Sequence, residues 1–134
     1  MLDIHASRAL ALVGTRFRPQ GRSAEHGLDC VGLLLCAFDL PPDTVRSDYR
    51  LRGAYREEIE QALHAGFRRI PNRWRRAGDV LLLAVAQDQL HLAIASEAGF
   101  VHADARLGRV VETRGEPRWP LLGVYRRRPG KGRG

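Results

Sequence analysis

Three residues in this sequence have the types that thiol-based amide chemistry needs: Cys30, His91 and His102. A cysteine thiolate attacks a carbonyl carbon, a neighbouring imidazole moves the proton from the thiol to the leaving amine, and a third polar group orients that imidazole. In this scheme Cys30 would be the nucleophile, His91 the base and His102 the orienting residue. The chemistry therefore requires elements that bring these three distant positions together.

Cys30 lies at the predicted start of a buried helix. Asp29 is a strong N-cap residue, and the apolar residues that follow occupy almost every helical face, as expected of a helix inside a core. Pro41 and Pro42 end this helix, which we expect over about residues 30–39. Unpaired backbone N–H groups at a helix start favour an anion, so we expect the Cys30 thiol to ionise more readily than a free one. A small buried core cysteine is the alternative interpretation.

His91 lies on a predicted strand over residues 90–95. Strand alternation puts His91 on one face together with Ala93 and Ala95, and three larger apolar side chains on the other. The two alanines leave room for a close neighbour. We therefore expect the helix that begins at Cys30 to pack on the His91 face.

His102 lies on the next predicted strand, over residues 99–103. A turn of two or four residues between the strands would place His91 and His102 on the same face, whereas a three-residue turn or a bulge would separate them. The sequence is compatible with both arrangements. For each histidine the alternative is a half-buried structural residue, and we expect His5, His26 and His64 at the surface.

The element order predicts an α+β fold. Apolar spacing predicts a helix over about residues 3–13 and another from about residue 55, separated by loops at residues 15–28 and 43–53. Five strands follow, at residues 80–86, 90–95, 99–103, 109–113 and 122–127. Helices followed by an antiparallel meander indicate N-terminal helices packed on one face of a five-stranded, mainly antiparallel sheet. We expect one domain over residues 1–127 and a basic flexible tail at 128–134.

The positive charge is concentrated in two runs. The chain of 134 residues carries a net charge of +7, with 44% hydrophobic and 28% charged residues, as in an ordinary globular domain. Residues 68–76 and 126–134 are rich in arginine and lysine and contain no acid. Such patches suit a polyanion. Because no aromatic stacking surface or reading helix accompanies them, we do not expect a specific nucleic-acid partner.

The remaining ligand and targeting signals are weak. Cys30 and Cys36 point to different faces of one predicted helix, so we expect no disulfide between them. A metal site formed by Cys30, Cys36, His91 and His102 would have suitable ligand types but lacks the close paired spacing of zinc sites. Charged residues near the N-terminus interrupt any signal-peptide pattern, and no stretch has transmembrane length. We expect no metal, no membrane span and synthesis in the cytoplasm without a signal peptide.

Several ordered motifs carry a family resemblance. They are Gly14-Thr15-Arg16-Phe17-Arg18, Gly27-Leu28-Asp29-Cys30-Val31-Gly32-Leu33, Ala77-Gly78-Asp79-Val80-Leu81, His91-Leu92-Ala93-Ile94, Phe100-Val101-His102-Ala103 and Gly123-Val124-Tyr125. With these motifs, in this order over roughly residues 5–127, the chain resembles the NlpC family of papain-like cell-wall cysteine peptidases.

The resemblance implies a minimal papain-like domain that hydrolyses amide bonds in peptidoglycan stem peptides, typically between D-glutamate and a diamino acid. It also implies Cys30 as nucleophile, His91 as base, His102 as orienting residue, and no metal or organic cofactor. A compact domain without a signal peptide or wall-binding module is similar to members encoded with phage tail genes. The implied partners are therefore a stem peptide and phage tail proteins, with action at the cell wall.

Two residues depart from the family pattern in the predicted substrate site. Phe17 stands where the family usually has a tyrosine whose hydroxyl helps at the reacting carbonyl, so the ring is kept and the donor is lost. Val31 stands where serine is frequent, whereas Asp29, the other half of the usual contact to the substrate amine, is retained. An alternative that accommodates both departures is a structural tail component of the same fold with weak or absent activity.

Overall fold

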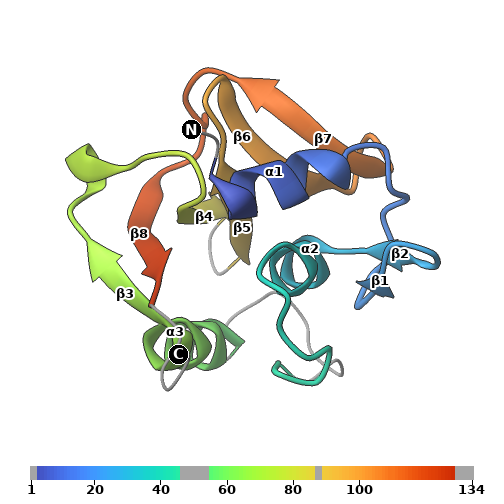
Figure 1. Ribbon diagram of the computed structural model, residues 1–134, viewed down its shortest axis with the longest axis horizontal. Helices are drawn as coiled ribbons and strands as arrows, with labels where there is room; N and C mark the ends of the chain where they lie inside the picture. The colour runs from blue at the N-terminus through green and yellow to red at the C-terminus, as the bar shows by residue number, and fades with distance from the viewer. Residues whose placement is uncertain (1–2, 46–54, 87–88, 129–134) are drawn as a thin grey trace.

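The computed structural model describes residues 3–45, 55–86 and 89–128, and it has the predicted α+β architecture (Figure 1). The α-helices are α1 (Ile4–Ala11), α2 (Cys30–Ala37) and α3 (Tyr55–Gly66), with a short 3-10 helix η1 (Asn72–Trp74). The main sheet contains β3 (Phe67–Ile70), β4 (Val80–Ala86), β5 (Gln89–Ala95), β6 (Gly99–Asp104), β7 (Arg109–Arg114) and β8 (Leu121–Arg127). A small hairpin of β1 (Arg22–Ser23) and β2 (Gly27–Leu28) precedes α2.

The main sheet has six strands in the order β3-β8-β4-β5-β6-β7, so the predicted number of five was wrong. The additional strand is β3, a four-residue edge strand whose two middle residues, Arg68 and Arg69, are both exposed. Such a segment shows no alternation of polar and apolar residues. The predicted meander holds for β4 to β7, but β8 returns to lie between β3 and β4. The predicted loop before Cys30 likewise contains the β1–β2 hairpin.

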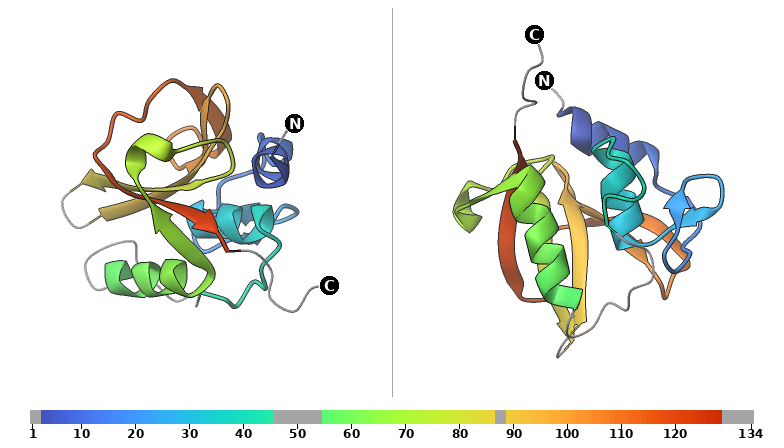
Figure 2. Two further views of the ribbon diagram at one scale, coloured as in Figure 1. Left: turned by 60° about the vertical axis from the view of Figure 1, so that its left-hand side comes forward. Right: turned by 90° about the horizontal axis from the view of Figure 1, so that it is seen from below.

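Helix α2 packs on the sheet face that carries Leu90, Leu92 and Ile94 (Figure 2). Ile59 and Leu63 of α3 join the same apolar core. The expectation that α2 covers the His91 face was therefore wrong. A helix that is apolar all round removes more apolar area from water against large side chains than against alanines.

The opposite face of the sheet forms a second, smaller core. Ala93 and Ala95 of β5 pack there with Leu81 and Phe100, and Trp119 lies at its edge. The segment that joins β7 to β8 packs Trp119 against this face. His91 thus points toward the side of the sheet with Trp119 rather than toward α2.

The β5–β6 register places the two histidines on one face. Ile94 pairs with Val101 and Ala95 with Phe100, which leaves the four residues 96–99 between the last paired residues. Continuing this register sets His102 opposite Ala93, which shares its face with His91. The same-face outcome is therefore confirmed. The β5–β6 ladder comprises these two pairs, whereas β6 pairs with β7 along its whole length.

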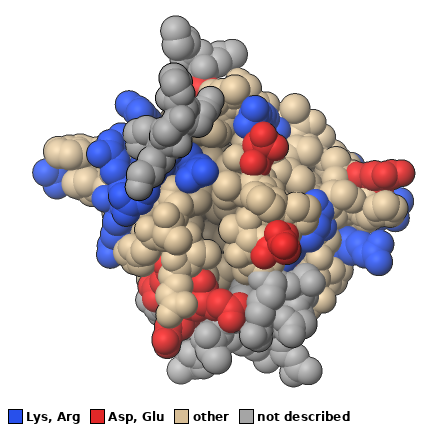
Figure 3. Space-filling view, turned by 60° about the horizontal axis from the view of Figure 1, so that its bottom comes forward, with Lys and Arg blue, Asp and Glu red and all other residues tan. Residues whose placement is uncertain are grey.

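The first residues of the two basic runs lie side by side, because β3 pairs with β8 and sets Arg68 opposite Arg126. Figure 3 shows arginines gathered on the side formed by β3 and η1. The Arg128 side chain donates from Nε to the carbonyl oxygen of Phe67 at 3.0 Å. The rest of the predicted tail, residues 129–134, and most of the predicted 43–53 connection lie outside the described residues. Within the described residues, no helix has the length and apolarity to cross a membrane.

Candidate active site

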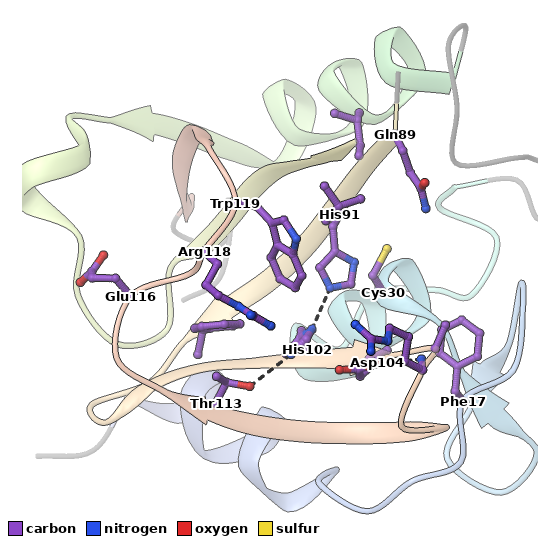
Figure 4. Close-up of a pocket in the computed structure, with 16 residues that line it drawn as sticks. Phe17, Cys30, Gln89, His91, His102, Asp104, Thr113, Glu116, Arg118 and Trp119 are labelled. Carbon is purple, nitrogen blue, oxygen red and sulfur yellow. Dashed lines mark hydrogen bonds between the residues drawn. The ribbon is translucent and has the colours of Figure 1, made fainter. Parts of the chain in front are cut away.

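Cys30, His91 and His102 line one pocket of about 310 Å³ (Figure 4). Cys30 is the first residue of α2, and Asp29 caps the helix by accepting a hydrogen bond from the Gly32 N–H at 2.9 Å. A Cβ atom on Gly32 would lie 2.0 Å from the Gly21 carbonyl oxygen. Glycine at this position therefore allows the loop before the hairpin to pack against the first turn of α2.

The two histidines form a hydrogen-bonded pair. His91 Nε2 lies 2.9 Å from His102 Nδ1, and His102 Nε2 lies 3.3 Å from the Thr113 hydroxyl. Because His91 uses Nε2 for His102, its Nδ1 is left for the thiol, and Figure 4 shows Cys30 beside His91. The order Cys30, His91 and His102 is the order that a nucleophile, a base and an orienting group would need.

The Cys30 thiol contacts the backbone of β5. The Ala95 N–H donates to the Asp79 carbonyl on the β4 side, at 2.8 Å. Since N–H directions alternate along a strand, the Leu92 N–H points the other way, toward β6, beyond the end of the β5–β6 ladder. This N–H contacts Cys30 and stabilises its thiolate. Cys30 therefore lies beside β5 at the end of its ladder with β6, in the pocket that His91 also lines.

Burial keeps both Cys30 and His91 uncharged. Burial raises the pKa of Cys30 to about 12, and the negative charge of Asp29 raises it further. Hydrogen bonds from the backbones of Leu92, Val31 and Cys30 lower this pKa, but by less. The prediction of an easily ionised thiol was wrong, because the helix-start donors contribute less than burial. Burial also lowers the pKa of His91 to about 4, with the charge of His102 adding and that of Asp104 opposing. Near neutral pH the site therefore holds a thiol and a neutral imidazole.

Only one of the three predicted substrate-contacting residues lines the pocket. Phe17 does so, and it presents a ring without a donor. The buried Asp29 carboxylate accepts hydrogen bonds from the Gln20 N–H at 2.8 Å and from Arg22 Nη1 at 3.3 Å, in addition to its cap. Val31 is 1% exposed and belongs to the apolar core. The amine contact assigned to Asp29 and Val31 stays a prediction.

Several residues that line the pocket were not identified from the sequence. Trp119 packs edge-on against both imidazoles, with ring-centroid distances of 5.6 Å to His91 and 5.8 Å to His102. The polar and charged ones are Gln89, Asp104, Arg106, Thr113, Glu116 and Arg118. Most of them come from strand ends and loops, where no periodic pattern marks a site. The one available signal was Thr113, on the predicted strand after that of His102.

The described residues contain no group of three or more potential ligands that could hold a metal ion. Cys36 does not join Cys30 and the histidines at the pocket; its thiol lies 3.6 Å from the Arg22 carbonyl oxygen. Burial raises the pKa of Cys36, and the charge of Arg22 opposes this shift. The two cysteines are both free thiols.

No family model and no curated protein matches the chain. Among solved structures, it is similar to the P60 domain of antigen MAP1204 from Mycobacterium avium subspecies paratuberculosis, with a TM-score of 0.61 and 19% identity, covering 92% of this chain and 91% of that one. It is also similar to the peptidoglycan hydrolase RipB from Mycobacterium tuberculosis, with a TM-score of 0.59 and 19% identity over 92% of this chain and 62% of that one.

A third similar structure is a lipoprotein-like protein of the NLP/P60 family from Staphylococcus aureus, with a TM-score of 0.57 and 20% identity. The match covers 95% of this chain and 41% of that one. At identities of 19% and 20%, these likenesses bear on the fold. The chain therefore has the fold of NlpC/P60 domains, as the ordered sequence motifs predicted.

Proposed function

We propose that this protein is a cysteine peptidase that hydrolyses amide bonds in peptidoglycan stem peptides. Cys30 is the nucleophile, His91 the general base and acid, and His102 the orienting residue. The observation that carries the proposal is the 2.9 Å contact between His91 Nε2 and His102 Nδ1, in the pocket that Cys30 lines. The fold shared with a peptidoglycan hydrolase supports the choice of substrate.

In the acylation step the Cys30 sulfur bonds to the substrate carbonyl carbon while His91 Nδ1 takes the thiol proton. The resulting imidazolium donates from Nε2 to His102 Nδ1, and His102 in turn donates from Nε2 to the Thr113 hydroxyl. His91 then gives its proton to the amide nitrogen, the carbon–nitrogen bond breaks, and the amine leaves. The acyl group stays on Cys30 as a thioester.

In the deacylation step His91 removes a proton from water, and the oxygen attacks the thioester carbonyl. The carbon–sulfur bond breaks, the product leaves as a carboxylic acid, and the proton returns to the sulfur. The Cys30 N–H, at the start of α2, would donate to the developing oxyanion. Phe17 adds no donor, so we expect slower turnover than in an enzyme with a tyrosine hydroxyl there.

The test compares the purified protein with a Cys30→Ala variant on stem-peptide fragments of defined sequence. Mass spectrometry should detect a new amine and a new acid with the intact protein and neither product with the variant. A Cys36→Ala variant is the matched control, because Cys36 lies outside the pocket, and it should retain activity. Absence of Cys30-dependent product from every stem peptide would contradict the proposal.

A structural component of the same fold with little activity is the second candidate. The observation that favours it is the neutral, buried Cys30 thiol beside a ring without a hydroxyl. Association with a phage tail, and action at the cell wall as part of such a particle, extend either candidate. Co-purification of the protein with tail particles, tested with an antibody against it, would separate a tail component from a free enzyme.

A further inference from the structure

Two guanidinium groups in the pocket have no partner among the described residues. Arg106 comes from the turn between β6 and β7, and Arg118 from the segment between β7 and β8. Both residues are exposed, and neither side chain has an acceptor within the described part of the chain. Figure 4 shows Arg118 reaching from its loop toward His102. The pocket therefore presents cationic donors close to the reacting groups.

The acidic residues of the same pocket are already engaged. Asp104 accepts hydrogen bonds from the backbone of its own turn, at 2.8 Å from the Arg106 N–H and 3.0 Å from the Leu107 N–H. Glu116 is paired with the Arg75 guanidinium outside the pocket. The charges of the pocket that lack a partner are therefore positive, and they favour an anionic ligand over a protonated amine.

A guanidinium with free donors binds a carboxylate in a planar, two-point contact. The residues expected to bind a substrate amine are elsewhere, because Asp29 and Val31 are both buried outside this pocket. We propose that Arg118 binds a substrate carboxylate next to the scissile amide, and that Arg106 adds to the positive field. This inference rests on the proposed function and names the substrate class as acidic peptides.

The stem-peptide bond between D-glutamate and a diamino acid has such a carboxylate beside it. When D-glutamate is joined through its side-chain carboxyl, its α-carboxylate stays free and belongs to the same residue as the scissile carbonyl. Amidation of this α-carboxylate gives D-isoglutamine, a neutral group of nearly the same size. The two forms therefore isolate the contribution of the charge, while the scissile bond and the rest of the peptide stay the same.

The experiment measures kcat/KM for a pair of stem peptides that differ only in this amidation. The intact protein should prefer the acidic peptide by about tenfold to a hundredfold, as expected for a charge-assisted hydrogen bond. Arg118→Gln should lose most of this preference by slowing on the acidic peptide alone. Arg68→Gln removes the same charge from the exposed surface of β3 and should change neither value.

Equal kcat/KM for the two peptides, or an equal loss on both in Arg118→Gln, would overturn the inference. Binding to a Cys30→Ala background separates it from the proposed function. If no peptide is cleaved but the acidic form binds more tightly in an Arg118-dependent manner, the proposed function fails and the carboxylate site stands. Equal Kd values of the Cys30→Ala variant for the acidic and the amidated peptide would contradict the carboxylate site, whether or not the intact protein cleaves either peptide.

Discussion

Cys30 should remain a thiol throughout the physiological pH range, and this can be measured directly. Its pKa moves from 9.0 to about 12, which corresponds to a cost of about 4 kcal/mol for the thiolate. At pH 7 roughly one molecule in 10⁵ would carry the thiolate. The neighbouring His91, with a pKa lowered to about 4, is neutral at the same pH and does not hold an ion pair.

The assay is the ultraviolet absorbance of the thiolate, followed from about pH 5 to about pH 10 in the intact protein and in a Cys30→Ser variant. The difference between the two should stay flat over this range. Cys36→Ser identifies any signal from the second cysteine, whose pKa is also raised by burial. A rise below about pH 8 that disappears in Cys30→Ser would show a preformed thiolate–imidazolium pair, and burial would then not keep the thiol neutral.

Three further outcomes follow from the same contacts. Phe17→Tyr should raise kcat for stem-peptide hydrolysis by about tenfold or more, because it restores a donor where the pocket has a bare ring. The free energy of unfolding, measured by urea titration, should fall as the pH decreases from 6.5 to about 4, because His91 protonates more readily in the unfolded chain. His91 contributes at most about 3 kcal/mol to this fall. Asp79→Asn should lower the free energy of unfolding by about 3 kcal/mol, because it removes the charge that Arg126 contacts at 2.8 Å.

Each outcome has its own control. Phe17→Leu should not raise kcat, and an equal gain in it would assign the effect to packing rather than to the hydroxyl. His91→Gln should flatten the acidic fall in stability, and an unchanged slope would assign the fall to other groups. Glu97→Gln alters an exposed acid near the Asp79 end of the sheet and should leave the urea midpoint unchanged.

The parts of the site that follow local rules could be predicted from the sequence. Asp29 caps a helix whose first residue is Cys30, and β4 begins and ends at the predicted residues. The same-face arrangement of the histidines follows from the four residues between the last paired residues of β5 and β6, one of the two lengths that the register argument allows. These features depend on capping and on strand period, which are encoded in neighbouring residues.

The parts that depend on tertiary packing could not be predicted. The face chosen by α2 is set by which sheet surface offers larger apolar side chains across several strands, and Leu82 beside Leu92 belongs to that choice. The pKa of Cys30 depends on how completely the fold buries it, which a capping signal does not reveal. Arg118 and Trp119 reach the pocket because β8 returns to pair with β4, a connection that leaves no periodic pattern.

Catalysis by Cys30 requires a covalent bond between its sulfur and the substrate. A rapid acid quench during turnover, followed by digestion and mass spectrometry, tests it on the peptide of residues 23–46, which contains both cysteines. We expect a thioester on Cys30 whose added mass equals the acyl half of the stem peptide, present during turnover and absent once the substrate is consumed. Product formation without any adduct on Cys30, or at the same rate in Cys30→Ala, would contradict it.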